Sequence, residues 1–213
     1  MIWLESPTNP TLKLINVRAI AAIAHSHPAH PFLLVDNTFL SPYYSSPLEL
    51  GADAVLHSLT KYVNGHSDVV MGAVILPPST SVSADPAIQE KHAQWSAKLR
   101  FLQNATGAVP SPYDSWMVQR GIKTLQVRMR QHGLNALKVA RALKNTTAIA
   151  RDGKPLVREV HYPGLEGDRR YELAWASLST HARKWIVREL LPQSNSPVGL
   201  NGSPTTPVDY TPS

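Results

Sequence analysis

The stretch Asp53-Ala-Val-Leu-His-Ser-Leu-Thr-Lys-Tyr-Val-Asn-Gly-His-Ser-Asp68 decides which fold we expect for this chain. Its apolar run 54–56 predicts a buried strand, which ends in the hydroxyl residues Ser58 and Thr60, with Lys61 directly after them. Hydroxyls and backbone N–H groups bind phosphate. An amine beside a bound phosphate monoester suggests a lysine that holds a phosphorylated cofactor as a Schiff base. By itself, Ser-x-Thr-Lys favours a simpler interpretation, a polar strand end with an exposed lysine, because these residue types are common on surfaces.

A second apolar run, Pro31-Phe-Leu-Leu-Val-Asp-Asn-Thr38, predicts another buried strand that ends in the carboxylate of Asp36. The chain between Asp36 and Lys61 is long enough for one crossover between parallel strands, which takes about a dozen residues or more. Strand ends of such a sheet line the ligand crevice, so we expect both side chains to face one site. A carboxylate at a pyridine nitrogen and a lysine at the other end of the ring are what a pyridoxal phosphate enzyme requires.

Further motifs accompany these two strands along the chain. They are Ser6-Pro-Thr-Asn-Pro10, Val35-Asp-Asn-Thr38, Ser58-Leu-Thr-Lys-Tyr62, Asn64-Gly-His-Ser-Asp68, Arg100-Phe-Leu-Gln-Asn104, Gly107-Ala-Val-Pro-Ser-Pro112, Arg120-Gly-Ile-Lys-Thr-Leu125 and Tyr162-Pro-Gly-Leu165. In order and spacing they resemble the cystathionine γ-lyase group, the pyridoxal-phosphate-dependent enzymes of cysteine and methionine metabolism. The resemblance extends at least to Arg188.

The resemblance implies an α/β fold of fold type I, the aspartate-aminotransferase-like class, with a mostly parallel sheet and flanking helices. It assigns residues 1–120 to a partial cofactor-binding large domain, 121–145 to a connecting helix and 146–191 to the start of a C-terminal domain. Residues 192–213 have the composition of a disordered tail. Because a strand is predicted at the first residues, and because family members are longer on both sides, we expect a partial chain, incomplete at both ends.

The resemblance also implies roles for five residues. Lys61 would form the Schiff base with pyridoxal 5'-phosphate and later act as the general base. Asp36 would keep the ring nitrogen protonated, and Ser58 and Thr60 would bind the phosphate. Asn9 would donate to the phenolic oxygen of the ring. The implied reaction is γ-elimination, which converts cystathionine into cysteine, 2-oxobutanoate and ammonia.

Other functions remain open at this point. Cystathionine β-lyase, cystathionine γ-synthase, methionine γ-lyase and the homoserine sulfhydrylases share the residues quoted above. The family's ring-stacking tyrosine, glycine-rich phosphate loop and cross-subunit tyrosine and arginine would precede Met1, and its carboxylate-binding arginine would follow Ser213. We therefore expect this chain alone to be weakly active or inactive. A non-catalytic remnant that binds cofactor weakly, or only packs against full-length relatives, is the second hypothesis.

Composition narrows the partners. The 213 residues carry a formal net charge of +6 without a basic block, which disfavours nucleic acid. The absence of cysteine excludes disulfides and thiolate metal sites. His25, His27 and His30 share their spacing with no carboxylate, so no metal site is expected. No apolar run approaches about 20 residues and the start is not a signal peptide, so we expect no membrane partner and a cytoplasmic location. The resemblance implies a homo-oligomer.

The remaining elements follow from periodicity and capping. We expect strands at 2–4, 69–76 (buried) and 157–161, and helices at 17–27 after Asn16, 48–50 before Gly51, 86–103, 112–120 after Ser111 and broken by Gly121, 122–143, and 173–191. Arg128 and Arg130 are expected on the solvated face of the 122–143 helix. Tyr43 and Tyr44 are interpreted either as substrate contacts or as packing beneath a loop.

Overall fold

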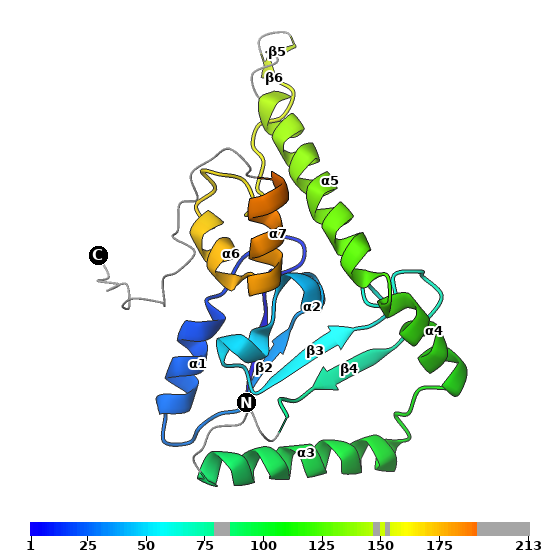
Figure 1. The fold of residues 1–213 in the computed structure, drawn as a ribbon. Helices are drawn as coiled ribbons and strands as arrows, with labels where there is room; N and C mark the ends of the chain where they lie inside the picture. The colour runs from blue at the N-terminus through cyan, green and yellow to red at the C-terminus, as the bar shows by residue number, and fades with distance from the viewer. Residues whose placement is uncertain (79–85, 147–149, 152–153, 191–213) are drawn as a thin grey trace.

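The computed structural model describes residues 1–78, 86–146, 150–151 and 154–190, and its core is a four-stranded sheet (Figure 1). The strands follow chain order: β1 (Ile2–Glu5), β2 (Leu33–Asp36), β3 (Ala54–Ser58) and β4 (Gly72–Ile75). β1, β2 and β3 are parallel, and β4 is antiparallel to β3. The predicted α/β class with a mostly parallel sheet is therefore confirmed.

Helix α1 (Val17–Ser26) connects β1 to β2 and covers one face of the sheet. It begins where predicted, because the Asn16 side chain accepts a hydrogen bond from the Ala19 N–H at 3.1 Å. Its buried residues Val17 and Ala21 pack against Leu33 and Val35 of β2. Burying this apolar stripe is what fixes the helix on the sheet.

The second crossover contains two short helices. They are α2 (Ser41–Tyr44) and the 3₁₀ helix η1 (Pro47–Leu50). The 3₁₀ helix η1 ends at Gly51, as predicted, because Gly51 takes φ 98°, which glycine adopts without steric cost. Tyr43 and Tyr44 are both buried, so these two tyrosines pack beneath the loop.

Longer helices follow the sheet. They are α3 (Pro86–Thr106), α4 (Pro112–Ile122), α5 (Leu125–Thr146), α6 (Tyr171–Ser177) and α7 (Thr180–Leu190), with the short strands β5 (Ala150–Arg151) and β6 (Lys154–Pro155) after α5. Figure 1 shows α6 and α7 grouped beside α2, and α3 lying apart from the other helices. Trp95 of α3 stacks on Phe32 with ring centroids 4.6 Å apart, which anchors α3 to the face opposite α1.

Two predictions in the middle of the chain were wrong. The run 69–76 was expected to be a buried strand, but β4 is shorter, and Val74 and Ile75 are 46% and 39% exposed. Among the described residues it pairs only with β3, so its apolar side chains lie at a sheet edge. Gly121 was expected to break a helix, but α4 continues through it to Ile122. A side chain at Gly121 would overlap the carbonyl of Asn64, so close packing explains this glycine.

The C-terminal predictions were also corrected. No strand forms at 157–161, where Val160 instead packs on the cluster of Leu137 and Leu165. The helix predicted at 173–191 is interrupted at Ser179, which separates α6 from α7. Ser179 donates its N–H to Tyr44 O and its hydroxyl to Tyr43 O, both at 2.8 Å, and these tertiary bonds replace helix continuation.

Some predictions stay open. The tail 192–213 lies outside the described residues, and the division into domains remains a prediction. Within the described part of the chain, no helix is both long enough and apolar enough to cross a membrane.

Candidate functional site

Asp36 and Ser58 lie at the carboxyl ends of β2 and β3, on the same end of the sheet. Both strands are parallel, and Asp36 is paired with Leu56. Side chains alternate between the two faces of a strand, so Ser58 is the next residue after Leu56 on the face that Asp36 occupies. Both residues are partly buried. The Asp36 carboxylate and the Ser58 hydroxyl therefore lie at the carboxyl ends of neighbouring strands, where open α/β sheets bind their ligands.

Thr38 ties these two strand ends together. Its N–H donates to Asp36 Oδ1 at 3.0 Å, and its hydroxyl accepts from the Ser58 N–H at 2.9 Å. The first bond orients the Asp36 carboxylate, and the second holds β3 at a fixed distance from the loop after β2. Sequence reasoning did not identify Thr38, although its position two residues after Asp36 is typical of an Asx turn.

Lys61 begins a tight turn directly after β3. Its N–H donates to Ser58 O at 3.2 Å, and its carbonyl accepts from the Gly65 N–H at 2.8 Å. The side chain is exposed, and its amine has no hydrogen-bond partner among the described residues. The main chain at Lys61 is thus fixed on both sides while the amine is available for reaction.

The two predicted phosphate ligands differ in their present contacts. The Thr60 hydroxyl accepts from the Met71 N–H at 3.0 Å and donates to Met71 O at 3.3 Å, which links the turn to the residue before β4. The Ser58 hydroxyl has no partner within the part of the chain that the structure describes. A hydroxyl has one proton to donate. Ser58 is therefore the readier donor to a phosphate, and Thr60 would have to give up its bond to Met71 O.

Asn9 lies in the loop that follows β1, at the same edge of the sheet, and is exposed. The loop is closed by two bonds of Thr8, whose N–H donates to Lys13 O at 3.0 Å and whose carbonyl accepts from Leu12 N–H at 2.9 Å. From the C-terminal segment, Arg170 donates to Leu12 O at 2.9 Å. A contact between residues this distant in sequence could not be read from local pattern.

Asp168 holds Arg170 in place, and we expect this ion pair to make the free energy of unfolding depend on pH. Asp168 accepts from Arg170 Nε at 2.9 Å and Nη2 at 2.8 Å, and these bonds lower the pKa of Asp168 from 3.8 to about 2. A lowered pKa contributes stability that is present above about pH 4 and is lost as the pH falls towards 2. We expect Asp168→Asn to remove on the order of 1–2 kcal/mol of this acid-sensitive stability.

The measurement is urea unfolding of wild type and Asp168→Asn at pH 6 and pH 3. The gap between their unfolding free energies should narrow at the lower pH, because protonation removes the charge that the asparagine already lacks. An equal gap at both pH values would contradict the prediction. Glu49→Gln, at an exposed carboxylate that forms no ion pair among the described residues, serves as the control.

His57 is a site neighbour that sequence reasoning passed over. His57 is the last residue but one of β3. Its side chain is buried, and its Nδ1 has no hydrogen-bond partner within the described residues. Burial lowers the pKa of His57, while the charge of Asp36 acts in the opposite direction. A neutral imidazole therefore lies close enough to Asp36 to respond to its charge. The available signal was its place in the strand, directly before Ser58.

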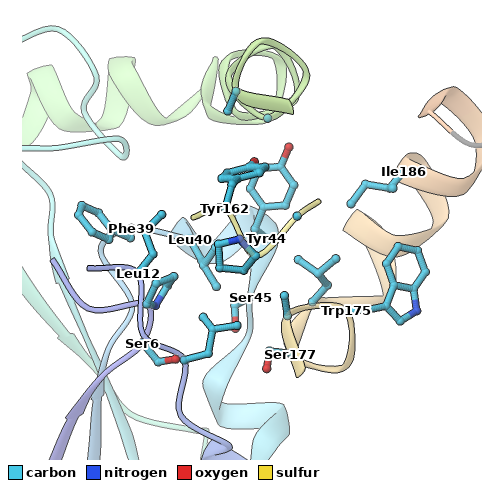
Figure 2. A pocket seen from close by; sticks show the side chains of 18 of the residues that line it. Ser6, Leu12, Phe39, Leu40, Tyr44, Ser45, Tyr162, Trp175, Ser177 and Ile186 are labelled. Carbon is cyan, nitrogen blue, oxygen red and sulfur yellow. The ribbon is translucent and has the colours of Figure 1, made fainter. Parts of the chain in front are cut away.

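Two cavities flank this edge of the sheet. An apolar one of about 390 Å³ separates Ser6, Leu12 and Phe39 from Trp175 and Ile186 (Figure 2). None of the five predicted site residues is among its described lining. A wider one of about 1500 Å³ lies between β4 and α3, and both predicted phosphate ligands, Ser58 and Thr60, are in its lining. The wider cavity thus adjoins the candidate site.

The residues at the sheet edge fit pyridoxal phosphate in chemical type. A partner-free amine, a carboxylate with one bonded oxygen and a partner-free hydroxyl match the aldehyde, the ring nitrogen and the phosphate of that molecule. Within the described part of the chain, no three or more histidine and acidic residues are grouped so that they could hold a metal ion.

A comparison with protein families agrees with this chemistry. Residues 1–183 match the family described as Cys/Met metabolism PLP-dependent enzyme. The chain belongs to this family. Members depend on pyridoxal phosphate, so the cofactor expected from the two strands is the family's cofactor.

Individual members of this family are similar to the chain in sequence, and one solved structure is also similar in fold. Cystathionine gamma-lyase of Sus scrofa is 48% identical over 174 residues, which cover 82% of this chain and 37% of the relative. A probable cystathionine gamma-synthase of Herpetosiphon aurantiacus is 47% identical, covering 82% and 47%. The crystal structure of cystathionine gamma-lyase from Lactobacillus plantarum complexed with L-serine matches with a TM-score of 0.66 and 38% identity, covering 84% of this chain and 40% of that one. The chain thus spans less than half the length of these relatives.

Proposed function

We propose that this protein is a pyridoxal-phosphate-dependent carbon–sulfur lyase in which Lys61 carries the cofactor. The observation that supports this most is that Asp36 and Ser58 end neighbouring parallel strands on the same face of the sheet. Lys61 follows three residues after Ser58. Family membership supports the same conclusion.

In this proposal each predicted site residue has a stated role, and Lys61 both carries the cofactor and handles the α-proton. Pyridoxal phosphate, when bound, supplies an electron sink for the charge left on the substrate α-carbon. The Asp36 carboxylate holds a proton on the ring nitrogen, and a fixed charge of this kind is usually a large part of an enzyme's rate gain. The Ser58 hydroxyl and, once released from Met71, the Thr60 hydroxyl donate to phosphate oxygens. Asn9 would donate its amide N–H to the phenolic oxygen, and the Lys61 amine would accept the proton that leaves the substrate α-carbon.

For the substrate we propose a sulfur amino acid: cystathionine, with one water consumed, would be cleaved by γ-elimination to cysteine, 2-oxobutanoate and ammonia. Gamma-lyases of several organisms support this choice. The second candidate is synthesis of cystathionine, which the nearly equal identity to the probable gamma-synthase favours. We also propose a homo-oligomer and a cytoplasmic location, both as expected from the sequence.

The test begins with cofactor attachment. The purified chain is mixed with pyridoxal phosphate and reduced with borohydride, and its peptides are mapped by mass spectrometry. We expect one modified lysine, Lys61. Attachment spread over several lysines, or none in folded protein, would contradict the proposal and favour a non-catalytic remnant.

Substrate preference is then measured on the same sample. Release of 2-oxobutanoate from cystathionine would identify the lyase, whereas formation of cystathionine from cysteine and a homoserine ester would identify the synthase. The two reactions are separated by their products, so one chromatographic assay decides between them.

A further inference from the structure

We infer that Arg128 is a positioning residue for Lys61, clamping the turn that presents the lysine amine. This inference rests on the proposed function of Lys61. Arg128 was predicted to lie on the solvated face of its helix, and the structure shows this to be wrong, because the side chain is partly buried and makes four hydrogen bonds within the protein.

The guanidinium of Arg128 donates to three backbone carbonyls, which lie in two separate segments, and to one hydroxyl. Nη1 donates to Tyr62 O at 2.7 Å, and Nη2 donates to Val63 O at 3.3 Å and to Gly121 O at 3.0 Å. Nε donates to the Thr124 hydroxyl at 3.0 Å. The first two acceptors are the two residues directly after Lys61, and the others belong to the junction between α4 and α5. One side chain therefore fastens the lysine turn to the helices.

The Arg128 guanidinium is held by uncharged acceptors. No carboxylate forms an ion pair with Arg128 among the described residues, and its acceptors are neutral carbonyls and a hydroxyl. Burial lowers the pKa of Arg128, yet an arginine stays protonated in proteins. A planar guanidinium holds up to five acceptors at fixed angles, whereas a lysine ammonium has three donors that rotate about one bond.

Two glycines make room for the clamp. Gly65 has φ 76°, and a side chain there would overlap the Arg128 guanidinium. Gly121 faces the other side of the turn, where a side chain would overlap Asn64 O. The turn is therefore held between α4 and the guanidinium. Because the Gly65 N–H also bonds the Lys61 carbonyl at 2.8 Å, fixing Gly65 fixes the main chain of Lys61.

A neighbouring arginine provides a matched control. Arg130 lies two residues further along α5 and donates from Nε to the Tyr43 hydroxyl at 3.0 Å, away from the lysine turn. Both arginines are partly buried and both were expected in solvent. Arg128→Gln and Arg130→Gln thus remove the same charge from the same helix, and only the first releases the turn.

The experiment measures the reactivity of Lys61 in the full chain. The rate of pyridoxal phosphate attachment to Lys61, trapped with borohydride, is compared for wild type, Arg128→Gln, Arg128→Lys, Gly65→Ala and Arg130→Gln. We expect Arg128→Gln and Gly65→Ala to slow attachment on the order of tenfold, as loss of one charged hydrogen bond would. Arg128→Lys should restore little, and Arg130→Gln should stay within about twofold of wild type.

Backbone hydrogen exchange of residues 61–68 gives a second readout that needs no cofactor. Faster exchange of this turn in Arg128→Gln, but not in Arg130→Gln, supports the clamp, and unchanged exchange overturns it. Normal attachment rates in a destabilised Arg128→Gln would also overturn it, because the arginine would then stabilise the fold without positioning Lys61. Failure of wild type to attach cofactor at Lys61 would overturn the proposed function, and hydrogen exchange would still decide on the clamp. If Arg128→Gln does not fold, Arg128→Lys, which keeps the charge but loses the planar fork, tests the same contact by both readouts.

Discussion

Replacing Lys61 by alanine abolishes cofactor attachment, and this is the largest effect we expect from any single substitution. The Lys61 amine is exposed and partner-free among the described residues, so its removal should leave packing intact. A Schiff base needs a primary amine, so Lys61→Ala should show no near-visible absorption from bound cofactor and no borohydride-trapped adduct. The unfolding free energy should change by less than about 0.5 kcal/mol, as for other surface substitutions.

Two further variants complete this test. Lys61→Arg keeps the positive charge but cannot form the Schiff base under these conditions, so it should also lose the adduct. Lys123→Ala removes an exposed lysine from the α4–α5 junction and should behave as wild type. An adduct of wild-type yield in Lys61→Ala would refute the assignment of the cofactor lysine.

Replacing Asp36 by asparagine should leave the cofactor attached but slow its chemistry on the order of 100-fold. Asparagine keeps the shape and the contact with the Thr38 N–H at 3.0 Å, because an amide oxygen can accept that bond. It does not keep the negative charge that holds a proton on the ring nitrogen, and removing one preorganised electrostatic group typically costs about this factor. The measurement is exchange of the amino-acid α-proton for deuterium, followed by NMR.

Glu5→Gln is the matched control for Asp36→Asn. Glu5 ends β1 and pairs in register with Asp36, so the same carboxylate-to-amide change is made on the neighbouring strand. Its side chain is exposed, and α-proton exchange should stay within about twofold of wild type. Equal slowing in both variants would mean that the general negative field of this sheet edge matters, rather than a carboxylate at the ring nitrogen.

Asp168→Asn addresses the loop that carries Asn9. Its stability should lose sensitivity to acid, and the same variant should loosen the grip of Arg170 on Leu12 O. Arg128 and Arg170 thus share a feature: each cation binds backbone carbonyls of a loop at the candidate site. Neither was found from the sequence, because an arginine on a helix or in a turn gives no sign of which distant carbonyls it will meet.

The sequence by itself located the first three strands, the polar residues that end the second and third, and the parallel crossover between those two; their order in the sheet came from the structure. It could do so because buried strands are continuous apolar runs, and because polar residues mark where each run stops. It also located the helix starts at Asn16 and Ser111, since capping is a local hydrogen bond between near neighbours.

Only the tertiary structure decided how those residues are held. β4 is an exposed edge strand because, among the described residues, it pairs only with β3. Ser179 interrupts a predicted helix because it forms hydrogen bonds with the tyrosines of α2. Gly121 stayed helical because Asn64 packs against it, and Arg128 turned inward to reach Tyr62 O. Each of these outcomes depends on a partner far away in the chain, and local periodicity and capping carry no information about such partners.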